Sequence, residues 1–249
     1  RDLRMSRGLG DVYKRQDQEV AFQAVDYILR VLKKNMVFGM TWGRAMHEFV
    51  EQLAKDERLR SLSFQNVKVV PFLGTPGAIQ SDSWNTTTYS NTLATKVGNL
   101  LHCASYNLSA PMYVEGTKEK ELIESIDEIA KVLHMAETAD IALIGIGSMQ
   151  DDSSIIKAEI RTREEYKELV RKGAVGEIVG RIYDKNGQTV DEDLKRKMVG
   201  ISLDKIAKIP VRVGMSYGKD KIEAIKGAIA GGLVNVLVTD VPTAELLLK

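Results

Sequence analysis

Residues 211–240, VRVGMSYGKDKIEAIKGAIAGGLVNVLVTD, decide the fold class of this chain of 249 residues. The stretch reads as a buried strand, a tight loop, an amphipathic helix and a second buried strand. Ile222, Ile225 and Ile229 follow the helical repeat, so we expect them to form one apolar stripe that faces a sheet. Two short apolar strands joined by a helix are typical of a parallel sheet covered by helices.

The start of that helix carries an unusual charge. Lys219 and Lys221 lie where unpaired backbone N–H groups and the positive end of the helix macrodipole already gather. A cation there costs roughly 0.3–1 kcal/mol unless an anion offsets it. A bound phosphate or carboxylate would supply that anion. Two solvated surface lysines are the alternative interpretation.

The composition narrows the class of protein. Hydrophobic residues make up 44% of the chain, and the net charge of +1 provides no bulk field that would attract nucleic acid or an anionic membrane. Cys103 is the single cysteine, which excludes an internal disulfide and a cysteine-rich zinc site. No apolar run approaches the roughly 18–20 residues of a membrane span, and nothing resembles a signal peptide. The sequence predicts a soluble cytoplasmic protein with no cofactor, no metal and no membrane partner.

Residues 1–16, RDLRMSRGLGDVYKRQ, differ from the rest of the chain. They are rich in basic residues and show no helical or strand periodicity, so we expect a disordered or non-native leader. A basic arm that contacts DNA phosphates is the alternative. Residues 17–249 contain no linker rich in Gly, Pro or Ser, and we expect them to form one domain.

Strands alternate with helices from Asp17 onward, and each strand is a short continuous apolar run. This order favours an α/β fold: a Rossmann-like open, mostly parallel sheet with helices on both faces. The turn sequence DKNG, residues 184–187, predicts a small appended β-hairpin. Thr162 and Glu165 have the spacing of a capping box and predict the start of a helix.

Ligands of an open α/β sheet bind at the carboxyl ends of its strands. Five polar, glycine-bearing loops follow predicted strands, at residues 39–46, 72–77, 145–154, 175–181 and 216–221. Together they offer backbone N–H groups, hydroxyls, acids and cations, which favours a small polyhydroxylated anion as ligand. Nucleotide motifs do not fit, because GMSYGKD lacks the hydroxyl residue after its lysine and GIGSMQ lacks the third glycine.

Several loop residues have two interpretations. Trp42 is suited to stacking on a ligand or to packing in the core, and Arg44 to a phosphate contact or a surface ion pair. Glu177 lies within an apolar strand pattern, where a carboxylate needs a partner, and we expect it to face a ligand. Gly74 and Gly147 permit either a turn with positive φ or the close approach of a ligand.

Taken together, these segments resemble the sugar-binding effector domain of the SorC/DeoR family of bacterial sugar-responsive transcriptional regulators. The resemblance extends from about Asp17 to the C-terminus. It rests on the order and spacing of TWGRAM, VPFLG, SNTLA followed by APMYV, ALIGIGSM, KGAVGEIVGRIYDKNG, VGISLDKIAKIP and KIEAIKGAIAGGLVNVLVTD.

The resemblance implies a fold like that of ribose-phosphate isomerase, glucosamine-phosphate deaminase and CoA-transferases. It implies a sensor that binds a phosphorylated sugar or polyol, or a free sugar. It also implies operator DNA as a partner, bound through an N-terminal helix-turn-helix domain that residues 1–16 are too short to form. Regulators of two-fold operators assemble symmetrically, so a homodimer or homotetramer is expected.

The positions that match the family imply a ligand site. A loop after the first strand binds phosphate, and a second glycine-bearing loop and an asparagine on the next helix line the pocket. Glu177 matches an acid that binds ligand hydroxyls, and Lys221 matches a lysine that contacts the phosphate. The chain departs from the family at Tyr217, which replaces a glycine, and at the additional Lys219. The predicted ligand-binding residues are Thr41, Trp42, Gly43, Arg44, Gly74, Thr75, Asn91, Gly147, Ser148, Glu177 and Lys221.

A second hypothesis is a sugar-phosphate isomerase or deaminase. That chemistry needs a carboxylate base with a raised pKa beside the substrate carbon. Glu177 is the one reasonable candidate, and no histidine lies in a strand-end loop to accompany it. Fold resemblance would not separate sensor from enzyme, but the missing catalytic group does, and we predict no enzymatic activity.

Overall fold

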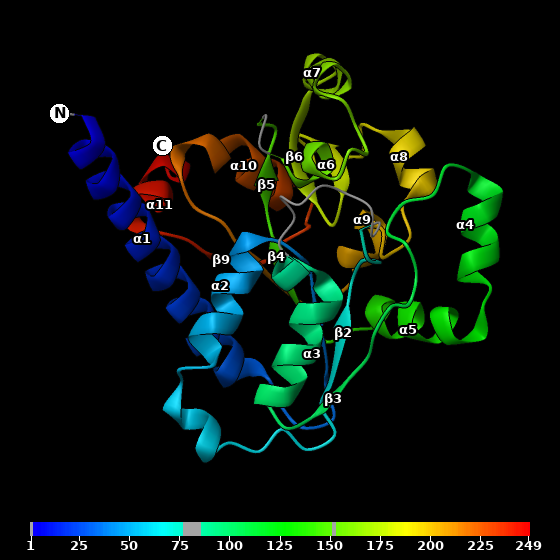
Figure 1. Ribbon diagram of the computed structural model, residues 1–249, viewed down its shortest axis with the longest axis horizontal. Coiled ribbons are helices and arrows are strands. Elements are labelled where there is room, and N and C mark those ends of the chain that lie inside the picture. The colour runs from blue at the N-terminus through cyan, green and yellow to red at the C-terminus, as the bar shows by residue number, and fades with distance from the viewer. Residues whose placement is uncertain (1, 77–85, 151–152) are drawn as a thin grey trace.

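A six-stranded parallel sheet forms the centre of the molecule (Figure 1). The computed structural model describes residues 2–76, 86–150 and 153–249. The strands follow the order β3-β2-β1-β4-β8-β9, and every neighbouring pair is parallel. Their bounds are Val37–Met40 for β1, Lys68–Pro71 for β2, Ala104–Ser105 for β3, Ile141–Gly145 for β4, Val211–Met215 for β8 and Val236–Val238 for β9. The strand order reverses between β1 and β4, which is where such sheets bind ligands.

Both faces of the sheet are buried, which explains why its strands read as continuous apolar runs. Ile141 and Leu143 of β4 pack into the cluster formed with the first three helices, whereas Ala142 and Ile144 pack into the cluster on the opposite face. The first face is covered by α1 (Asp2–Val31), α2 (Arg44–Leu53) and α3 (Ser90–Leu100), and the second by α5 (Asp127–Glu137), α9 (Leu203–Ile206) and α10 (Ile222–Ala230). The predicted α/β architecture is confirmed.

A small antiparallel sheet of β5, β6 and β7 lies against α10. The Tyr183 hydroxyl joins the two by donating to the carbonyl of Ala224 at 2.9 Å. The bounds of these strands are Gly147–Ser148, Ala174–Ile178 and Arg181–Asp184. The remaining elements are α4 (Thr117–Glu124), α6 (Ser154–Lys157), α7 (Arg163–Arg171), α8 (Glu192–Lys197), α11 (Val241–Leu247) and the 3₁₀ turns η1 (Glu57–Arg60), η2 (Thr86–Thr88) and η3 (Lys219–Lys221).

The predicted apolar stripe of the helix after β8 is wrong in part. Ile225 is fully buried, but Ile229 is 49% exposed. The helix instead buries its small residues, Ala224, Gly227 and Ala228. The reason is close packing: a methyl group on Gly227 would lie 2.8 Å from the carbonyl oxygen of Asp184. The small sheet therefore selects a narrower face of α10 than hydrophobicity alone indicates.

The predicted DKNG hairpin is present, with an antiparallel bridge between Tyr183 and Thr189 on either side of its turn. A second turn, which the sequence did not predict, joins β6 to β7. Val179 and Gly180 join β6 to β7, and both have positive φ angles, 52° and 66°. The DKNG sequence forms the next turn, after β7, where the Gly187 N–H donates to the Asp184 carbonyl at 2.9 Å. A β-branched residue rarely adopts positive φ, so nothing in the sequence indicated the turn at Val179. The capping box of Thr162 and Glu165 is present as predicted.

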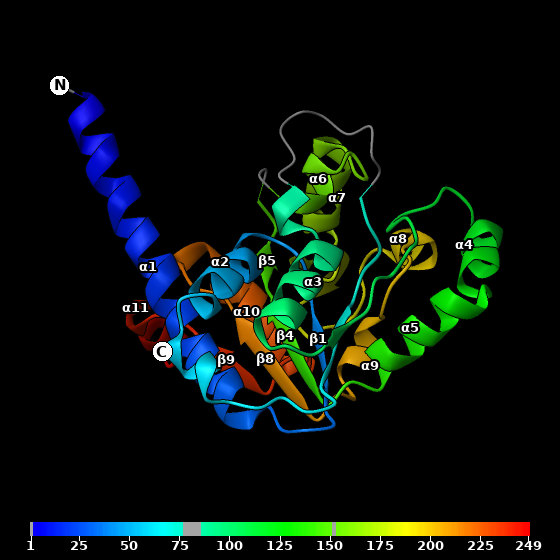
Figure 2. The same ribbon diagram turned by 60° about the horizontal axis from the view of Figure 1, so that its bottom comes forward.

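Residues 2–16, for which the sequence predicted a disordered or non-native leader, are helical in the structure. They continue α1 outward from the body of the protein (Figure 2). A helix that is already packed propagates at one hydrogen bond per added residue, so this extension needs no apolar stripe of its own. The division of the chain at residue 16 stays a prediction. Within the described residues, no helix is both long and apolar enough for a membrane crossing.

Replacing Gly187 by alanine tests how tightly the DKNG turn packs on α10. Gly187 has φ 73°, and an added Cβ would lie 2.5 Å from the Cα of Gly231. Gly173 has φ 97° and no atom within 4 Å of such a Cβ, so Gly173→Ala carries the backbone strain without the clash. We expect Gly187→Ala to lower the free energy of unfolding by about 1–3 kcal/mol more than Gly173→Ala, in chemical denaturation. Equal losses would show that α10 moves freely away from the methyl group.

Candidate functional site

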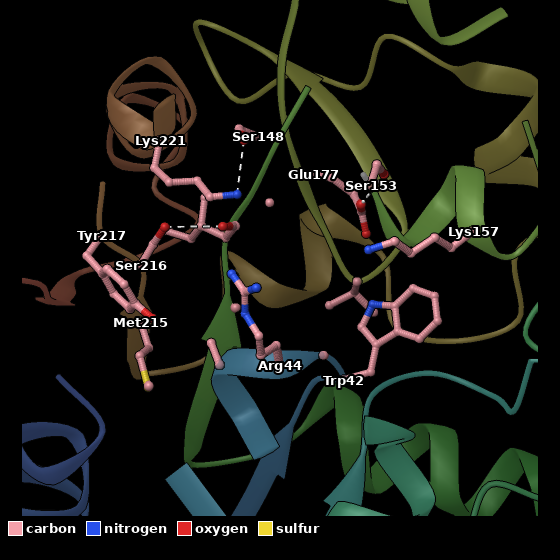
Figure 3. A pocket seen from close by; sticks show the side chains of 16 residues that line it. Trp42, Arg44, Ser148, Ser153, Lys157, Glu177, Met215, Ser216, Tyr217 and Lys221 are labelled. Carbon is pink, nitrogen blue, oxygen red and sulfur yellow. Dashed lines mark hydrogen bonds between the residues drawn. The ribbon is translucent and has the colours of Figure 1, made fainter. Parts of the chain in front are cut away.

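A cavity of about 240 Å³ opens where β1, β4 and β8 end, beside the small sheet (Figure 3). Four of the five predicted loops contribute to its lining, and the loop at 72–77 contributes none of its described residues. The lining residues are 42–45, 145–148, 153, 157, 177, 179, 215–217 and 221. Residues 77, 151 and 152, which belong to the predicted loops, lie outside the described residues. The cavity therefore lies at the carboxyl ends of the strands, as the loops predicted, and the strand order reverses at the same point.

The loop after β1 turns sharply into α2 at Gly43, whose φ is 107°. Thr41 is buried below this turn, and its hydroxyl accepts the N–H of Gly145 at 3.0 Å. Thr41 thus fastens the end of β1 to the end of β4 and lies outside the lining. Trp42 is 6% exposed, packs in the core and also lines the cavity. Its stacking on a ligand stays a prediction. The side chain of Arg44 points into the cavity (Figure 3).

The N-terminus of α2 faces this cavity without a negative group of its own. Its N-cap is Gly43, which has no side chain to accept a hydrogen bond, and the first turn contains no acidic residue. The unpaired N–H groups and the macrodipole leave positive potential there, and Arg44 adds a full charge. This end of the helix is therefore suited to an anion.

Lys221 brings a second cation to the cavity from the start of α10. Its Nζ donates to the hydroxyl of Ser148 at 3.0 Å and lies 3.7 Å from a carboxylate oxygen of Asp220. Ser148 in turn donates to Asp220 at 3.2 Å, so β5 and η3 hold the ammonium group between them. Lys219 is exposed and lies outside the lining. Of the two unusual lysines, only Lys221 faces the site.

Glu177 supplies a carboxylate to the same cavity and is only 6% exposed. It lies on β6 opposite Gly147, and its oxygens accept the Gly180 N–H at 3.2 Å and the Ser153 hydroxyl at 3.3 Å. Burial raises the pKa of Glu177, and those two hydrogen bonds and the charge of Lys221 oppose that rise. Glu177 is thus a buried acceptor with both oxygens already oriented.

Three other predicted residues lie outside the lining. Asn91 donates to the Thr75 hydroxyl at 2.8 Å and to the Leu108 carbonyl at 3.0 Å, and accepts the Leu108 N–H at 2.9 Å. A Cβ on Gly74 would lie 2.6 Å from the carbonyl of Ala110, so close backbone packing requires glycine there. These contacts hold the segment that leads into residues 77–85, which lie outside the described residues. A ligand contact by Gly74, Thr75 or Asn91 stays a prediction.

The sequence did not single out several residues that the structure places in the lining. Lys157 follows the 145–154 loop by one helical turn, and Figure 3 shows its ammonium group beside Glu177. Ser153 and Ser216 lie within predicted loops, but a serine in a loop carries no distinct signal. Val179 has a left-handed backbone conformation that strains a β-branched residue by about 1–3 kcal/mol. Such strain is found at functional sites, but no sequence pattern announces it.

The arrangement combines two helix-start cations, a buried carboxylate and serine hydroxyls around one small cavity. Cations and backbone N–H groups bind an anionic group, whereas carboxylates and hydroxyls bind hydroxyl groups. Among the described residues, no group of three or more His, Cys, Asp or Glu side chains is placed to hold a metal ion. The geometry is that of a site for a small polar ligand.

Comparison with known proteins supports this interpretation. Residues 4–249 match the family described as "Putative sugar-binding domain". The sorbitol operon regulator of Klebsiella pneumoniae is 30% identical over 222 residues, which are 88% of this chain and 67% of that protein. The transcriptional regulator LsrR of Escherichia coli is 30% identical over 230 residues, 91% of this chain and 67% of LsrR.

Solved structures agree with these relatives. The full-length sorbitol operon regulator SorC of K. pneumoniae superimposes with a TM-score of 0.84 at 27% identity, covering 95% of this chain and 74% of SorC. A probable sor operon regulator of Shigella flexneri gives 0.82 at 26% identity, covering 94% of this chain and 89% of that one. The chain belongs to the sugar-binding domain family of the SorC/DeoR transcriptional regulators.

Proposed function

We propose that this domain binds a phosphorylated sugar or polyol and that binding modulates the DNA affinity of the regulator that carries it. The observation that supports the phosphate is the pair of Arg44 and Lys221, each at the start of a helix and both lining one cavity. Asp220 lies 3.7 Å from the Lys221 ammonium group and offsets part of its positive charge. Asp17 likewise interacts with the charge of Arg44. An anion bound between the two cations and the uncapped start of α2 would offset the rest. Glu177, in the same lining, suits the hydroxyl groups of the ligand.

The ligand would lie with its phosphate toward α2 and η3 and its hydroxyls toward β6. Arg44 offers a planar fork and Lys221 a point charge, and both are common phosphate contacts. Glu177 accepts from sugar hydroxyls, and Trp42 provides an apolar wall for the carbon skeleton. Lys157 stands beside Glu177 and would contact an oxygen at the end remote from the phosphate. A free sugar would use only the contacts with Glu177, Trp42 and Lys157.

The regulatory role rests on what the relatives are named for. A sorbitol operon regulator and LsrR are regulators of transcription. The ligand of such a domain changes DNA binding by favouring one of two arrangements of the whole protein. We expect a helix-turn-helix domain N-terminal to residue 17 and a homodimer or homotetramer, since operators with two-fold symmetry bind symmetric proteins.

Sensing is favoured over catalysis. A buried carboxylate with a raised pKa, such as Glu177, is what an isomerase or deaminase uses as a base. Within the described lining, however, Glu177 has no histidine and no second carboxylate beside it. Proton transfer between two carbons or to a leaving amine is commonly assisted by such a partner. We therefore propose that the ligand is bound and released unchanged.

A thermal-shift screen tests the proposal, with pentose and hexose phosphates each paired with its unphosphorylated sugar. A ligand at 100 times its Kd stabilises the folded protein by roughly 2.7 kcal/mol, which shifts the melting temperature visibly. We expect stabilisation by at least one phosphate and a weaker effect of its free sugar. Stabilisation by free sugars alone would overturn the phosphate assignment. Conversion of the stabilising compound, followed by NMR, would establish an enzyme instead.

A further inference from the structure

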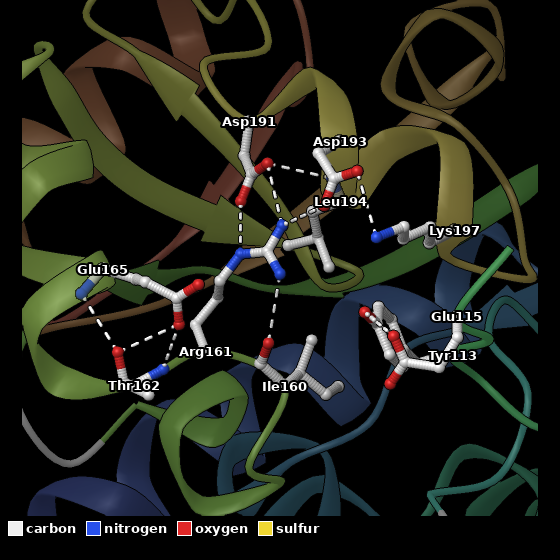
Figure 4. Close-up of polar contacts among 10 residues, drawn as sticks. All are labelled: Tyr113, Glu115, Ile160, Arg161, Thr162, Glu165, Asp191, Asp193, Leu194 and Lys197. Atoms are coloured by element: carbon white, nitrogen blue, oxygen red, sulfur yellow. Dashed lines mark hydrogen bonds and ion pairs between the residues drawn. The ribbon is translucent and has the colours of Figure 1, made fainter.

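Arg181, on β7, is buried without an acidic partner. It is 2% exposed, and it forms no ion pair with any described residue. Burial lowers the pKa of Arg181 to about 10, and the charge of Glu124 opposes that change. Arg161 provides the contrast in the same part of the molecule, because Asp191 and Asp193 both bind its guanidinium (Figure 4). Burying an arginine without a carboxylate partner costs free energy of folding, which indicates that its hydrogen bonds fix a specific backbone geometry.

The guanidinium of Arg181 donates to three backbone carbonyls. One is Val179, at 3.4 Å, in the turn between β6 and β7. The others are Met198 and Gly200, at 3.2 Å and 3.1 Å, in the segment between α8 and α9. Arg181 therefore connects the β6–β7 turn to a second stretch of backbone.

That second stretch is fixed to the main sheet. The Gly74 N–H donates to the Val199 carbonyl at 3.1 Å, and the Ile201 N–H donates to the Phe72 carbonyl at 2.9 Å. Phe72 directly follows β2. These two hydrogen bonds keep residues 198–200 in register with the segment that follows β2. The carbonyls that Arg181 holds are thus part of a rigid frame.

The turn at the other end of Arg181 is strained and borders the ligand cavity. Val179 lines the cavity with φ 52°, and Gly180 has φ 66°. The N–H of Gly180 donates to Glu177 at 3.2 Å, so the orientation of the carboxylate depends on this turn. A β-branched residue leaves the left-handed region unless its surroundings hold it there.

We propose that Arg181 is a positioning residue: it holds the Val179–Gly180 turn against the main sheet and thereby keeps the Gly180 N–H on Glu177. The inference rests on the proposed function in taking Glu177 as the ligand's hydroxyl acceptor. Arg181 does not touch the ligand itself, since it lies outside the lining. It acts through a backbone hydrogen bond that only the left-handed turn can make.

The pKa of Glu177 in the ligand-free protein reports on this hydrogen bond. Loss of the Gly180 N–H removes a contact that favours the ionised carboxylate, so the pKa rises. The other groups near Glu177 are Lys221, Ser153 and the hydroxyl of Tyr183, together with Lys157, and none of them changes in the experiment. The carboxyl resonance is followed by NMR in protein labelled at glutamate, and it is assigned by its absence in Glu177→Gln.

We expect Arg181→Met to raise the pKa of Glu177 by about 1, the size of one lost hydrogen bond to a carboxylate. Arg181→Lys keeps the charge but lacks the planar fork, and we expect the pKa to rise there too, which separates positioning from charge. If Arg181→Met does not fold, Arg181→Lys by itself tests the inference. Val179→Gly added to either variant should return the pKa toward the wild-type value, because glycine adopts positive φ without strain.

Arg161→Met is the matched control, since it removes a largely buried guanidinium from the same region and should lower stability without moving the pKa of Glu177. A wild-type pKa in any folded Arg181 variant would overturn the inference, as would an equal rise in Arg161→Met. The measurement needs no ligand. A shifted pKa in a protein that binds no sugar phosphate would therefore count against the proposed function alone.

Discussion

Replacing Arg44 and Lys221 together by methionine is expected to weaken the binding of a sugar phosphate by about 10²–10⁴-fold. Each charged hydrogen bond contributes about 1.5–3 kcal/mol, and the double variant removes at least two of them. The unphosphorylated sugar should lose less than about 10-fold, because its contacts lie on the Glu177 side of the cavity. Isothermal titration of both compounds against wild type and variant measures the two losses.

Lys219→Met is the control for that experiment. Lys219 is exposed, lies two residues from Lys221 and is outside the lining, and its replacement removes one positive charge. Surface charges contribute little, so we expect less than about a twofold change for either compound. If the double variant weakened both compounds equally, or if Lys219→Met were as damaging, then Arg44 and Lys221 would not form a phosphate site.

The second large effect concerns Glu177 and pH. Sugar hydroxyls donate to the ionised carboxylate, so affinity for an unphosphorylated sugar should rise as pH increases through the raised pKa of Glu177. Glu177→Gln should bind that sugar about 10–100-fold more weakly above this pKa, and its affinity should not vary with pH in the same window. Using a neutral sugar removes the titration of the phosphate itself.

Stability should change with pH in the opposite direction. Burial raises the pKa of Glu177 above its ordinary value, so between the two pKa values the folded protein binds more protons than the unfolded chain. The free energy of unfolding therefore falls as pH rises through this window, and it levels off above the folded-state pKa. Glu177→Gln should lack this contribution, and urea denaturation across the window would show the difference.

Glu124→Gln separates the pH dependence of sugar affinity from the pH dependence of stability. Burial also raises the pKa of Glu124, but this residue lies on α4, outside the cavity lining. Its replacement should alter the pH dependence of stability and leave the affinity for the sugar unchanged. A pH-dependent affinity that persists in Glu177→Gln would show that another group, not Glu177, receives the ligand's hydroxyls.

The sequence predicted the architecture well because burial on both faces leaves a plain pattern. A strand such as β4, buried through Ile141 to Ile144, must read as a continuous apolar run, and its helices must alternate with it. The polar loops at strand ends were also predictable, and four of them do line one cavity. The buried face of α10 was not predictable, because close contact with the small sheet selects glycine and alanine where hydrophobicity favours isoleucine.

What the sequence by itself determined is the parallel sheet, the loops at its carboxyl edge and the presence of Lys221 and Glu177 among them. Periodicity and local charge are properties of neighbouring residues, so they can be read along the chain. Only the tertiary structure decided that Lys221 faces the cavity while Lys219 faces solvent, and that Arg181 braces a strained turn at Val179. Those outcomes depend on hydrogen bonds and packing between segments far apart in the sequence, which no local pattern encodes.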